Sequence, residues 1–160
     1  MSDVQAAGNQ PRFSILRVYL KDASFESPAA PTLFISGENW RPKVNVELVT
    51  AAIALGADRY EVIVKATLQA EDEAGKSSYI VEVQQAGLFE VVGVNQEQLG
   101  IALEVNCPTI LFPYLREAID NLLVHGSFPP AGLVPINFEA RYAAELNRRK
   151  QTAEASPAIN

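Results

Sequence analysis

Apolar and polar residues alternate with a period of two in four segments of the first part of the chain. The clearest segment covers residues 60–70, where Val62 and Val64 fall on one side and Lys65 and Thr67 on the other. Because side chains of a β-strand point alternately to its two faces, this pattern predicts a strand with one apolar and one polar face. The same argument predicts three further strands, at residues 13–20 with a continuation to residue 26 after a break near Lys21, at residues 43–50 and at residues 77–91.

The segments between these strands indicate how the sheet is connected. Residues 71–76 are polar and contain a glycine, which predicts a hairpin loop between the third and fourth strands. The sequence has no helical pattern between the strands, such as the crossover connections of a parallel sheet would require. We therefore predict an antiparallel meander with one solvated face.

After the fourth strand the periodicity becomes that of helices. Residues 95–106 predict a short helix, and Pro108 suits the first turn of a longer one, where its missing N–H costs little. Gly126 predicts the end of the longer helix, and Asn137 predicts the N-cap of a last helix that runs through Arg149. One side of the longer helix is an apolar stripe, made of Ile110, Leu111, Tyr114, Leu115, Ala118, Ile119, Leu122 and Leu123.

A sheet followed by helices predicts an α+β fold, with a four-stranded antiparallel sheet and helices packed on one face. We expect a single domain at residues 13–150. Residues 1–12 and 151–160 are rich in Ala, Gln, Asn and Ser without periodicity, so we expect both to be disordered tails.

Composition and charge narrow the possible partners. The 160 residues are 48% hydrophobic and 20% charged, as in globular proteins. A net charge of -6 argues against nucleic acid or an anionic membrane as the main partner and favours a basic protein surface. No apolar run is long enough to span a bilayer, and the first residues lack the basic and apolar regions of a secretory signal. With one cysteine there is no internal disulfide, and we predict a cytoplasmic protein.

One segment resembles a phosphate-binding loop, at residues 70–77, with alanine at the position of its first glycine. A phosphate-binding loop leads into a helix, whereas a predicted strand follows here. Three consecutive acidic residues, Glu71, Asp72 and Glu73, would also repel a polyphosphate. We interpret the segment as an ordinary hairpin loop.

The remaining reactive side chains do not form a catalytic set. Cys107 and His125 lie at opposite ends of the predicted long helix, about 27 Å apart at 1.5 Å per residue. One cysteine and one histidine are too few for a typical zinc site. We expect Cys107 to be a buried apolar residue. The sequence therefore predicts a protein that is not an enzyme, with no cofactor and no metal.

Three surfaces remain as candidates, each with an ordinary alternative. Polar residues share one face of the first strand, at Asp22, Ser24 and Glu26, and another row contains Ile80, Glu82 and Gln84. These rows form either an acidic patch or merely solvated strand faces. The apolar stripe of the long helix is either core or a subunit interface. The aromatic residues Phe34, Trp40, Phe112 and Phe128 either belong to the core or line a groove for extended apolar peptide.

Several dense motifs, taken in order from about Phe13 to Leu146, resemble the SecB family of protein-export chaperones. The first is the strand of residues 18–26, followed by Trp40 with Pro42 and by residues 60–62 and 82–89. The later motifs are Cys107-Pro108-Thr109-Ile110-Leu111-Phe112-Pro113-Tyr114, Gly126-Ser127-Phe128-Pro129 and Pro135-Ile136-Asn137-Phe138.

The resemblance implies an ATP-independent chaperone that holds secretory precursors unfolded in the cytosol and delivers them to the export motor SecA. It implies a homotetramer built as a dimer of dimers, without nucleic acid or membrane insertion. It places SecA binding at Asp22, Glu26, Ile80 and Glu82, and a client-peptide groove at Trp40, Phe112 and Phe128. The alternative is a SecB-like chaperone that guards a toxin–antitoxin system. The basic run Arg148-Arg149-Lys150 departs from the family pattern, and its role stays open.

Overall fold

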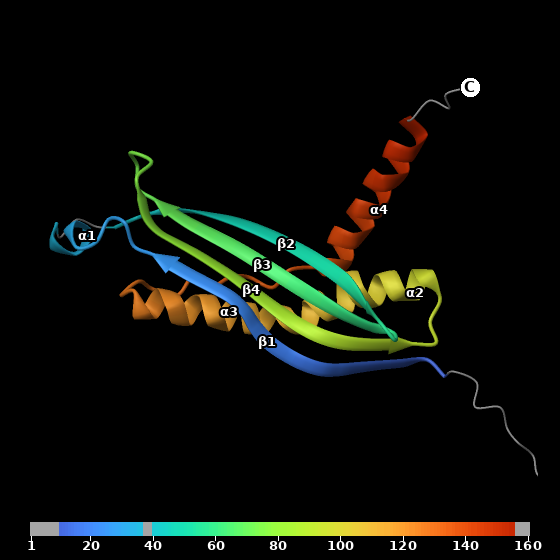
Figure 1. The fold of residues 1–160 in the computed structure, drawn as a ribbon. Helices are drawn as coiled ribbons and strands as arrows, with labels where there is room; N and C mark the ends of the chain where they lie inside the picture. Colours follow the sequence, from blue (N-terminus) through green and yellow to red (C-terminus); the bar gives the residue numbers. More distant parts are fainter. Residues whose placement is uncertain (1–9, 37–39, 156–160) are drawn as a thin grey trace, which may run out of the picture.

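The computed structural model describes residues 10–36 and 40–155, which form a four-stranded antiparallel sheet with a long helix along one face (Figure 1). The strands lie in the order β1-β4-β3-β2, with bounds β1 Arg12–Glu26, β2 Lys43–Gly56, β3 Arg59–Glu71 and β4 Ser77–Val92. The α+β prediction is confirmed. Only β2, β3 and β4 form the predicted meander. β1 pairs with β4 and not with β2, so the four strands form a Greek key. The connection between the edge strands β1 and β2 contains the short helix α1 (Thr32–Ile35).

Two irregularities interrupt the pairing of β1 with β4. The register shifts between Ile15 and Arg17 and again between Leu20 and Asp22. The second shift is a β-bulge at the place where the sequence predicts a break, near Lys21. Because a bulge adds one residue to one strand, Asp22 returns to the same face as Tyr19 although the two are three positions apart. The predicted break is thus a bulge within one continuous strand.

Two tight hairpins join β2, β3 and β4. The β2–β3 turn contains Ala57 and Asp58, whose φ angles of 51° and 58° are those of the turn type that best matches strand twist. In the β3–β4 loop the Asp72 carboxylate accepts hydrogen bonds from the backbone N–H groups of Ala74, at 2.9 Å, and Lys76, at 2.8 Å. The segment that resembles a phosphate-binding loop is therefore a hairpin loop, as predicted.

One continuous helical segment follows β4, which corrects the prediction of two separate helices. It consists of α2 (Gln96–Ile101), the π-helical turn η1 (Ala102–Asn106) and α3 (Cys107–His125). Pro108 lacks an N–H, and in a regular α-helix its ring would clash with the carbonyl four residues before it. In η1 the Cys107 N–H instead bonds to the carbonyl of Ala102, five residues before it. The wider turn lets the helix continue through the proline.

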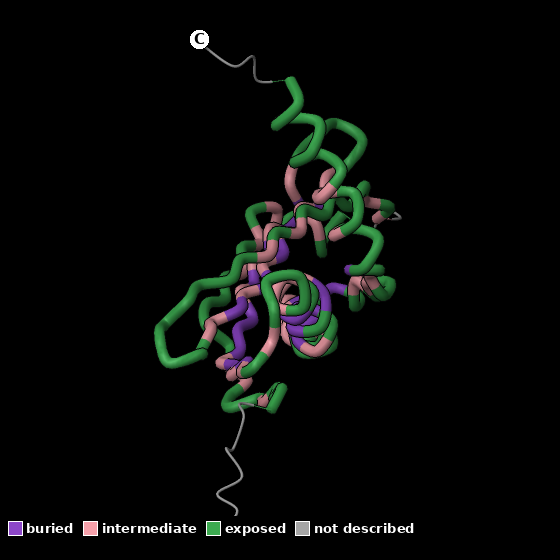
Figure 2. Tube along the Cα trace, turned by 90° about the vertical axis from the view of Figure 1, so that its right-hand side faces the viewer, coloured by how far each residue is buried: buried purple, intermediate pink, exposed green. Residues whose placement is uncertain are grey.

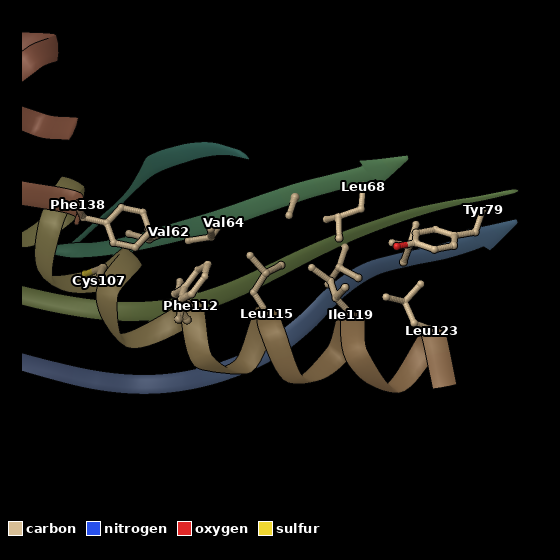
Figure 3. Close-up of a cluster of buried hydrophobic side chains, with 14 of the residues drawn as sticks. Val62, Val64, Leu68, Tyr79, Cys107, Phe112, Leu115, Ile119, Leu123 and Phe138 are labelled. Atoms are coloured by element: carbon tan, nitrogen blue, oxygen red, sulfur yellow. The ribbon is translucent and has the colours of Figure 1, made fainter. Parts of the chain in front are cut away.

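Helix α3 packs on the inner face of the sheet, which we define as the face it covers (Figure 3). Its fully buried row, spaced four residues apart, is Cys107, Leu111, Leu115, Ile119 and Leu123. This row packs with alternate residues of β3 and β4, chiefly Val62, Val64, Ala66, Leu68, Tyr79, Val81 and Val83. A second row, Ile110, Tyr114, Ala118 and Leu122, is only partly covered. The predicted apolar stripe is therefore half core and half surface.

The end of α3 differs in detail from the glycine stop that the sequence predicts. The left-handed residue is Ser127, with φ of 65°, and the Phe128 N–H bonds to the carbonyl of Leu123 at 2.9 Å. These are features of a Schellman motif. Gly126 has an ordinary φ of -81°. It is needed for another reason, because a Cβ atom there would lie 2.3 Å from the ring of Phe25.

Helix α4 (Phe138–Ala155) projects away from the sheet, and most of it is exposed (Figures 1 and 2). Asn137 caps it as predicted, because its side-chain oxygen accepts from the N–H of Ala140 at 3.0 Å. The helix continues beyond the predicted end at Arg149, so residues 151–155 are helical and not part of a disordered tail. Residues 1–9 and 156–160, which make up most of the two predicted tails, lie outside the described residues.

The extension of α4 has a local cause. Glu145 accepts hydrogen bonds from Arg148, at 2.6 Å, and Arg149, at 3.1 Å, one turn later. Such pairs stabilise a helix without any tertiary contact. The hydroxyl of Thr152 also donates to the carbonyl of Arg148 at 2.9 Å. Among the described helices, none combines the length and apolar character needed to cross a membrane.

Candidate binding surfaces

The four residues assigned to motor binding lie together on the outer face of the sheet, opposite α3. Glu26 lies opposite Ile80 in the pairing of β1 with β4. Glu82 lies opposite Ser24, and Asp22 is the next β1 residue on that face. Directly opposed residues share a face, so strand geometry makes one patch of these side chains. We call Asp22, Glu26, Ile80 and Glu82 the acidic patch.

Glu82 differs from the two carboxylates of β1 in having partners on β3. Its Oε1 lies 3.3 Å from the Lys65 ammonium, and its Oε2 accepts from the Thr67 hydroxyl at 3.2 Å. In the described part of the chain, no ion pair involves Asp22 or Glu26. Sequence analysis did not single out Lys65 as a neighbour of the patch. The alternation of β3 placed it on the polar face, but only the strand register shows that it reaches Glu82.

Further along the outer face, a hydrogen-bonded cluster joins β1 to β3. The Tyr19 hydroxyl and the Lys21 ammonium both donate to the carboxylate of Glu61, the latter at 2.6 Å. The small Ala86 of β4 lies opposite Tyr19 and leaves room for this contact. The hydrogen bond from Lys21, with that from Tyr19, lowers the pKa of Glu61. Burial, with help from Glu61, raises the pKa of Tyr19 to about 12.

An aromatic cluster lies at the end of the sheet near α1. The Trp40 and Phe34 rings lie 5.3 and 5.7 Å from the Phe128 ring, between centroids. Phe128 is buried and also packs edge-on against Tyr79, whose pKa burial raises. The indole N–H of Trp40 donates to the Ser78 hydroxyl at 3.0 Å. Phe34 remains 51% exposed, so the accessible side of the cluster is formed by Phe34 and Trp40.

Phe112, the third residue assigned to the client groove, lies elsewhere. It is 4% exposed and packs against Phe138 at 6.2 Å. Figure 3 shows it and Tyr79 at opposite ends of the core. The structure therefore brings Trp40 and Phe128 together but does not bring Phe112 to them. Spacing along the sequence did not show this, because α3 carries Phe112 away from the loop that contains Phe128.

One cleft of the structure was not predicted from the sequence. It has a volume of about 650 Å³ and lies between residues 48–52 of β2, η1 and α4. Phe138 and Tyr142 contribute aromatic surface, and Arg141 donates to the carbonyl of Leu48 at 3.2 Å. The cleft was missed because it forms where α4 and η1 lie beside β2, and no local sequence pattern encodes the direction in which the last loop sends α4.

A second groove, of about 390 Å³, separates β1 from α3. Its apolar residues include Leu20, which is 53% exposed, and Tyr114, which is 50% exposed. His125 lies at one end of it. The partly covered row of α3 therefore faces an open groove.

The remaining candidate residues show no reactive arrangement. Cys107 is buried, as predicted, and burial raises the pKa of its thiol to about 12, so the thiol is protonated at neutral pH. It stands at the opposite end of α3 from His125. Over residues 10–36 and 40–155, no cluster of three or more His, Cys, Asp or Glu side chains is arranged to hold a metal ion. In the basic run, Arg148 and Arg149 pair with Glu145, and Arg149 also lies 3.5 Å from Glu104.

Known proteins match the chain along most of its length. The model of the family described as preprotein translocase subunit SecB matches residues 6–149. The chain is 47% identical to the protein-export protein SecB of Marinobacter nauticus, covering 93% of this chain and 91% of that protein. It is 46% identical to that of Hahella chejuensis, covering 99% and 97%.

The fold has a solved counterpart. A SecB-like chaperone of Mycobacterium tuberculosis, in complex with a peptide from an antitoxin, matches with a TM-score of 0.62 at 20% identity. The match covers 78% of this chain and 91% of that one. At this identity the likeness supports the fold alone. From the family match and the close relatives, the chain belongs to the SecB family.

Proposed function

We propose that this protein is an ATP-independent chaperone of protein export, which holds secretory precursors unfolded in the cytoplasm and delivers them to the SecA motor. The observation that carries this proposal is the SecB match over residues 6–149, together with relatives 46–47% identical that are named protein-export proteins. An open cleft and an acidic patch with exposed Asp22 and Glu26 support a protein that binds polypeptides.

An aggregation assay tests the holding activity. A secretory precursor is diluted from denaturant with the protein, with and without ATP, and light scattering is followed. We expect suppression at stoichiometric amounts in both conditions, because the one phosphate-loop-like segment is a hairpin loop. Suppression that requires ATP, or no suppression at all, would contradict the proposal.

For client binding we propose the accessible aromatic cluster and the cleft beside β2. Trp40, Phe128 and Phe34 form one end of this proposed binding surface. Phe112 acts indirectly, because it packs against Phe138, which lines the cleft. Aromatic side chains supply large apolar contact area with few rotatable bonds, which suits binding of unrelated sequences.

For motor binding we propose the acidic patch. Its test is the double variant Asp22→Asn, Glu82→Gln, because loss of one exposed carboxylate alone should have only a small effect. Each exposed charge pair contributes about 0.2–1 kcal/mol, so we expect SecA binding to weaken several-fold at low salt and the difference to shrink as salt is added. The control is the double variant Glu139→Gln, Glu154→Gln, which removes the same number of charges at exposed positions of α4. Calorimetry that gives wild-type affinity for the folded double variant would refute the assignment.

For assembly we propose a tetramer of two dimers. Leu20 of β1 lines the groove with Tyr114 and Leu122 of the partly covered row of α3, and Phe13 and Ile15 of the same strand are also exposed. Exposed apolar surface of this kind commonly marks a protein interface. Light scattering is expected to give a tetramer for the wild type and a smaller particle for Leu20→Glu. A monomeric wild type at micromolar concentration would contradict this proposal.

A second candidate role is guarding a toxin–antitoxin pair. It is favoured by the likeness of fold to the chaperone solved with an antitoxin peptide. The export role has the stronger support, since its relatives are 46–47% identical and that chaperone is 20% identical. Co-purification of secretory precursors and SecA with the protein supports export, whereas selective co-purification of one antitoxin supports the alternative.

A further inference from the structure

The β-bulge in β1 brings two consecutive residues of opposite charge to the same face of the sheet. The ladder with β4 pairs Leu20 and Asp22, and Lys21 is the extra residue between them. In a regular strand, neighbouring side chains point to opposite faces. Here the Lys21 ammonium reaches Glu61 on the outer face, and Asp22 belongs to the acidic patch on that same face. The bulge therefore places a cation next to a carboxylate of the patch.

The bulge is required by the packing on either side of it. Val18 packs against the core before the bulge, and Phe25 packs against the core after it. The two residues are seven positions apart, and an odd separation would put their side chains on opposite faces of a regular strand. The extra residue corrects this, so both side chains reach the core. The packing of the inner face thus determines that Lys21 and Asp22 share the outer face.

Lys21 is within reach of Asp22. Consecutive Cα atoms lie about 3.8 Å apart, and the lysine side chain is a flexible stem of four carbons that ends in a point charge. Within residues 10–36 and 40–155, no ion pair is recorded for Asp22 or for Glu26. Without another partner for Lys21, its ammonium would pair with Asp22, and the acidic patch would lose one of these two carboxylates.

Glu61 of β3 holds the Lys21 ammonium elsewhere. Its Oε1 accepts from Lys21 at 2.6 Å, and its Oε2 accepts from the Tyr19 hydroxyl. The hydrogen bond from Lys21, with that from Tyr19, lowers the pKa of Glu61, so the carboxylate is ionised at neutral pH. The two donors come from the same strand and fix the orientation of the carboxylate. Lys21 is therefore bound to a carboxylate outside the acidic patch.

Glu61 is poorly placed to contact a protein partner itself. Its side chain is 14% exposed, whereas that of Lys21 is 40% exposed. Both of its oxygens already accept hydrogen bonds within the chain. Asp22 and Glu26, in contrast, are exposed. An influence of Glu61 on partner binding therefore has to act through Lys21.

We propose that Glu61 is a positioning residue of the motor-binding surface, which holds the Lys21 ammonium away from Asp22 and so keeps the Asp22 carboxylate available to a basic segment of the motor. The inference rests on the proposed binding of SecA to the acidic patch. It adds a residue that lies outside the patch and does not touch the motor.

The variant Glu61→Gln tests the proposal. Glutamine keeps the size of the side chain and an oxygen for the Tyr19 hydroxyl, but it lacks the charge that binds Lys21. We expect SecA to bind this variant about threefold to fivefold more weakly in about 0.1 M salt, as calorimetry measures, because the released Lys21 pairs with Asp22. Suppression of precursor aggregation should stay at the wild-type level, since the change lies on the outer face and outside both grooves.

The Lys21→Met background separates this mechanism from the simple loss of one negative charge. Methionine keeps the apolar stem and lacks the ammonium. We expect Lys21→Met to bind SecA at least as tightly as the wild type does. Adding Glu61→Gln to Lys21→Met should then change binding by less than about 1.5-fold, because no cation is released. A direct contact of Glu61 with SecA, or a structural defect in β1, predicts the same loss in both backgrounds.

Glu90→Gln is the matched control on the same face. Glu90 also pairs with two cations from neighbouring strands, Arg12 and, at 3.7 Å, Arg59. It lies eight residues along β4 from Glu82, about 26 Å at 3.3 Å per residue, which exceeds the screening length of about 10 Å in 0.1 M salt. We expect SecA to bind Glu90→Gln within about 1.5-fold of the wild type.

The outcomes separate this inference from the proposed function. Wild-type affinity of folded Glu61→Gln for SecA overturns the inference, and so does an equal loss in both Lys21 backgrounds or in Glu90→Gln. Failure of the wild type to bind SecA contradicts the proposed motor binding instead. If Glu61→Gln does not fold, as judged by circular dichroism, Glu61→Asp replaces it in the same comparison, because the shorter side chain withdraws the carboxylate from Lys21 without changing the net charge.

Discussion

Helices α3 and α4 are nearly equal in length, with 19 and 18 residues, and each carries an apolar row on one side. α3 buries seven residues against the sheet, whereas α4 buries only Phe138. The row of α4 continues through Tyr142 and Leu146, but these side chains are only partly covered because the helix points away from the sheet (Figure 1). An apolar row therefore predicts which side of a helix makes contact, and not how far along the helix the contact extends.

The two helices are stabilised by different means. α3 gains most from burial, since most helical stability in proteins comes from packing of an apolar face. α4 depends more on local interactions, namely the Asn137 cap and the pairs of Glu145 with Arg148 and Arg149. Changes in α3 should therefore lower the stability of the whole domain, whereas changes in α4 should act within that helix.

The largest effect is expected from Leu115→Ala in α3. Leu115 is 0% exposed at the centre of the buried row, so its truncation leaves a cavity as well as losing apolar burial. We expect the free energy of unfolding to fall by about 2–5 kcal/mol, measured by urea denaturation at one fixed protein concentration. The control is Val134→Ala in the last loop, where Val134 is 77% exposed and the change should stay within about 0.5 kcal/mol. Equal losses in the two variants would show that α3 is not a core helix.

Gly126→Ala should have the next largest effect, at the end of α3. An alanine Cβ would lie 2.3 Å from the Phe25 ring, so the ring must move and nearby packing must change. We expect a loss of about 1–3 kcal/mol in the free energy of unfolding. Because φ at Gly126 is -81°, backbone strain contributes little. The double variant Gly126→Ala, Phe25→Leu should therefore be less destabilised than the sum of its single changes, and strict additivity would refute this explanation.

Asn137→Ala should have a smaller effect, confined mainly to α4. The change removes the hydrogen bond from the Ala140 N–H to the Asn137 side chain. Loss of an N-cap costs about 1 kcal/mol of helix stability. We expect faster hydrogen exchange in the first turns of α4 with little change in α3, as measured by NMR. Asn137→Ser keeps a capping oxygen and should restore protection. Equal loss of protection in α3 and α4 would contradict the expectation that changes in α4 act within that helix.

Strand alternation predicted much of the fold and part of the site. It placed Val62 and Val64 on the buried face, and Glu26 and Glu82 on the exposed one. It did not show that β1 pairs with β4. The two segments are far apart in the chain, and the alternation of apolar and polar residues in β1 is equally compatible with pairing to other strands. The bulge near Lys21 was visible only as a break in the alternation.

Tertiary packing determined the features that sequence did not predict. Gly126 follows the last residue of α3, as predicted, but its small size is required by the distant Phe25, which the sequence did not show. The cleft beside β2 depends on the direction in which the last loop sends α4, which no local pattern encodes. Phe112 and Phe128 are both buried aromatic residues, and only the length of α3 separates them. Contacts between distant segments were thus the main source of error.

The smallest effect is expected from the charges of α4 as the pH is lowered. The hydrogen bond from Arg148, with further help from Arg149, lowers the pKa of Glu145 to about 2. Since this value lies below the ordinary carboxyl pKa of about 4.3, the ionised form stabilises the helix. The contribution is complete above the ordinary value and is lost as the pH falls toward about 2.

Hydrogen exchange along α4 between about pH 6 and pH 2 measures this loss, after correction for the intrinsic pH dependence of exchange. We expect the second half of α4 to lose protection on acidification while the buried row of α3 keeps it. In Glu145→Gln the second half should already be less protected at pH 6 and should change little on acidification. Glu154→Gln, near the end of the same helix and outside the recorded ion pairs, should keep the wild-type profile. If Glu145→Gln and the wild type follow the same profile, the ion pairs do not stabilise α4, and contacts of Tyr142 and Leu146 must account for its length.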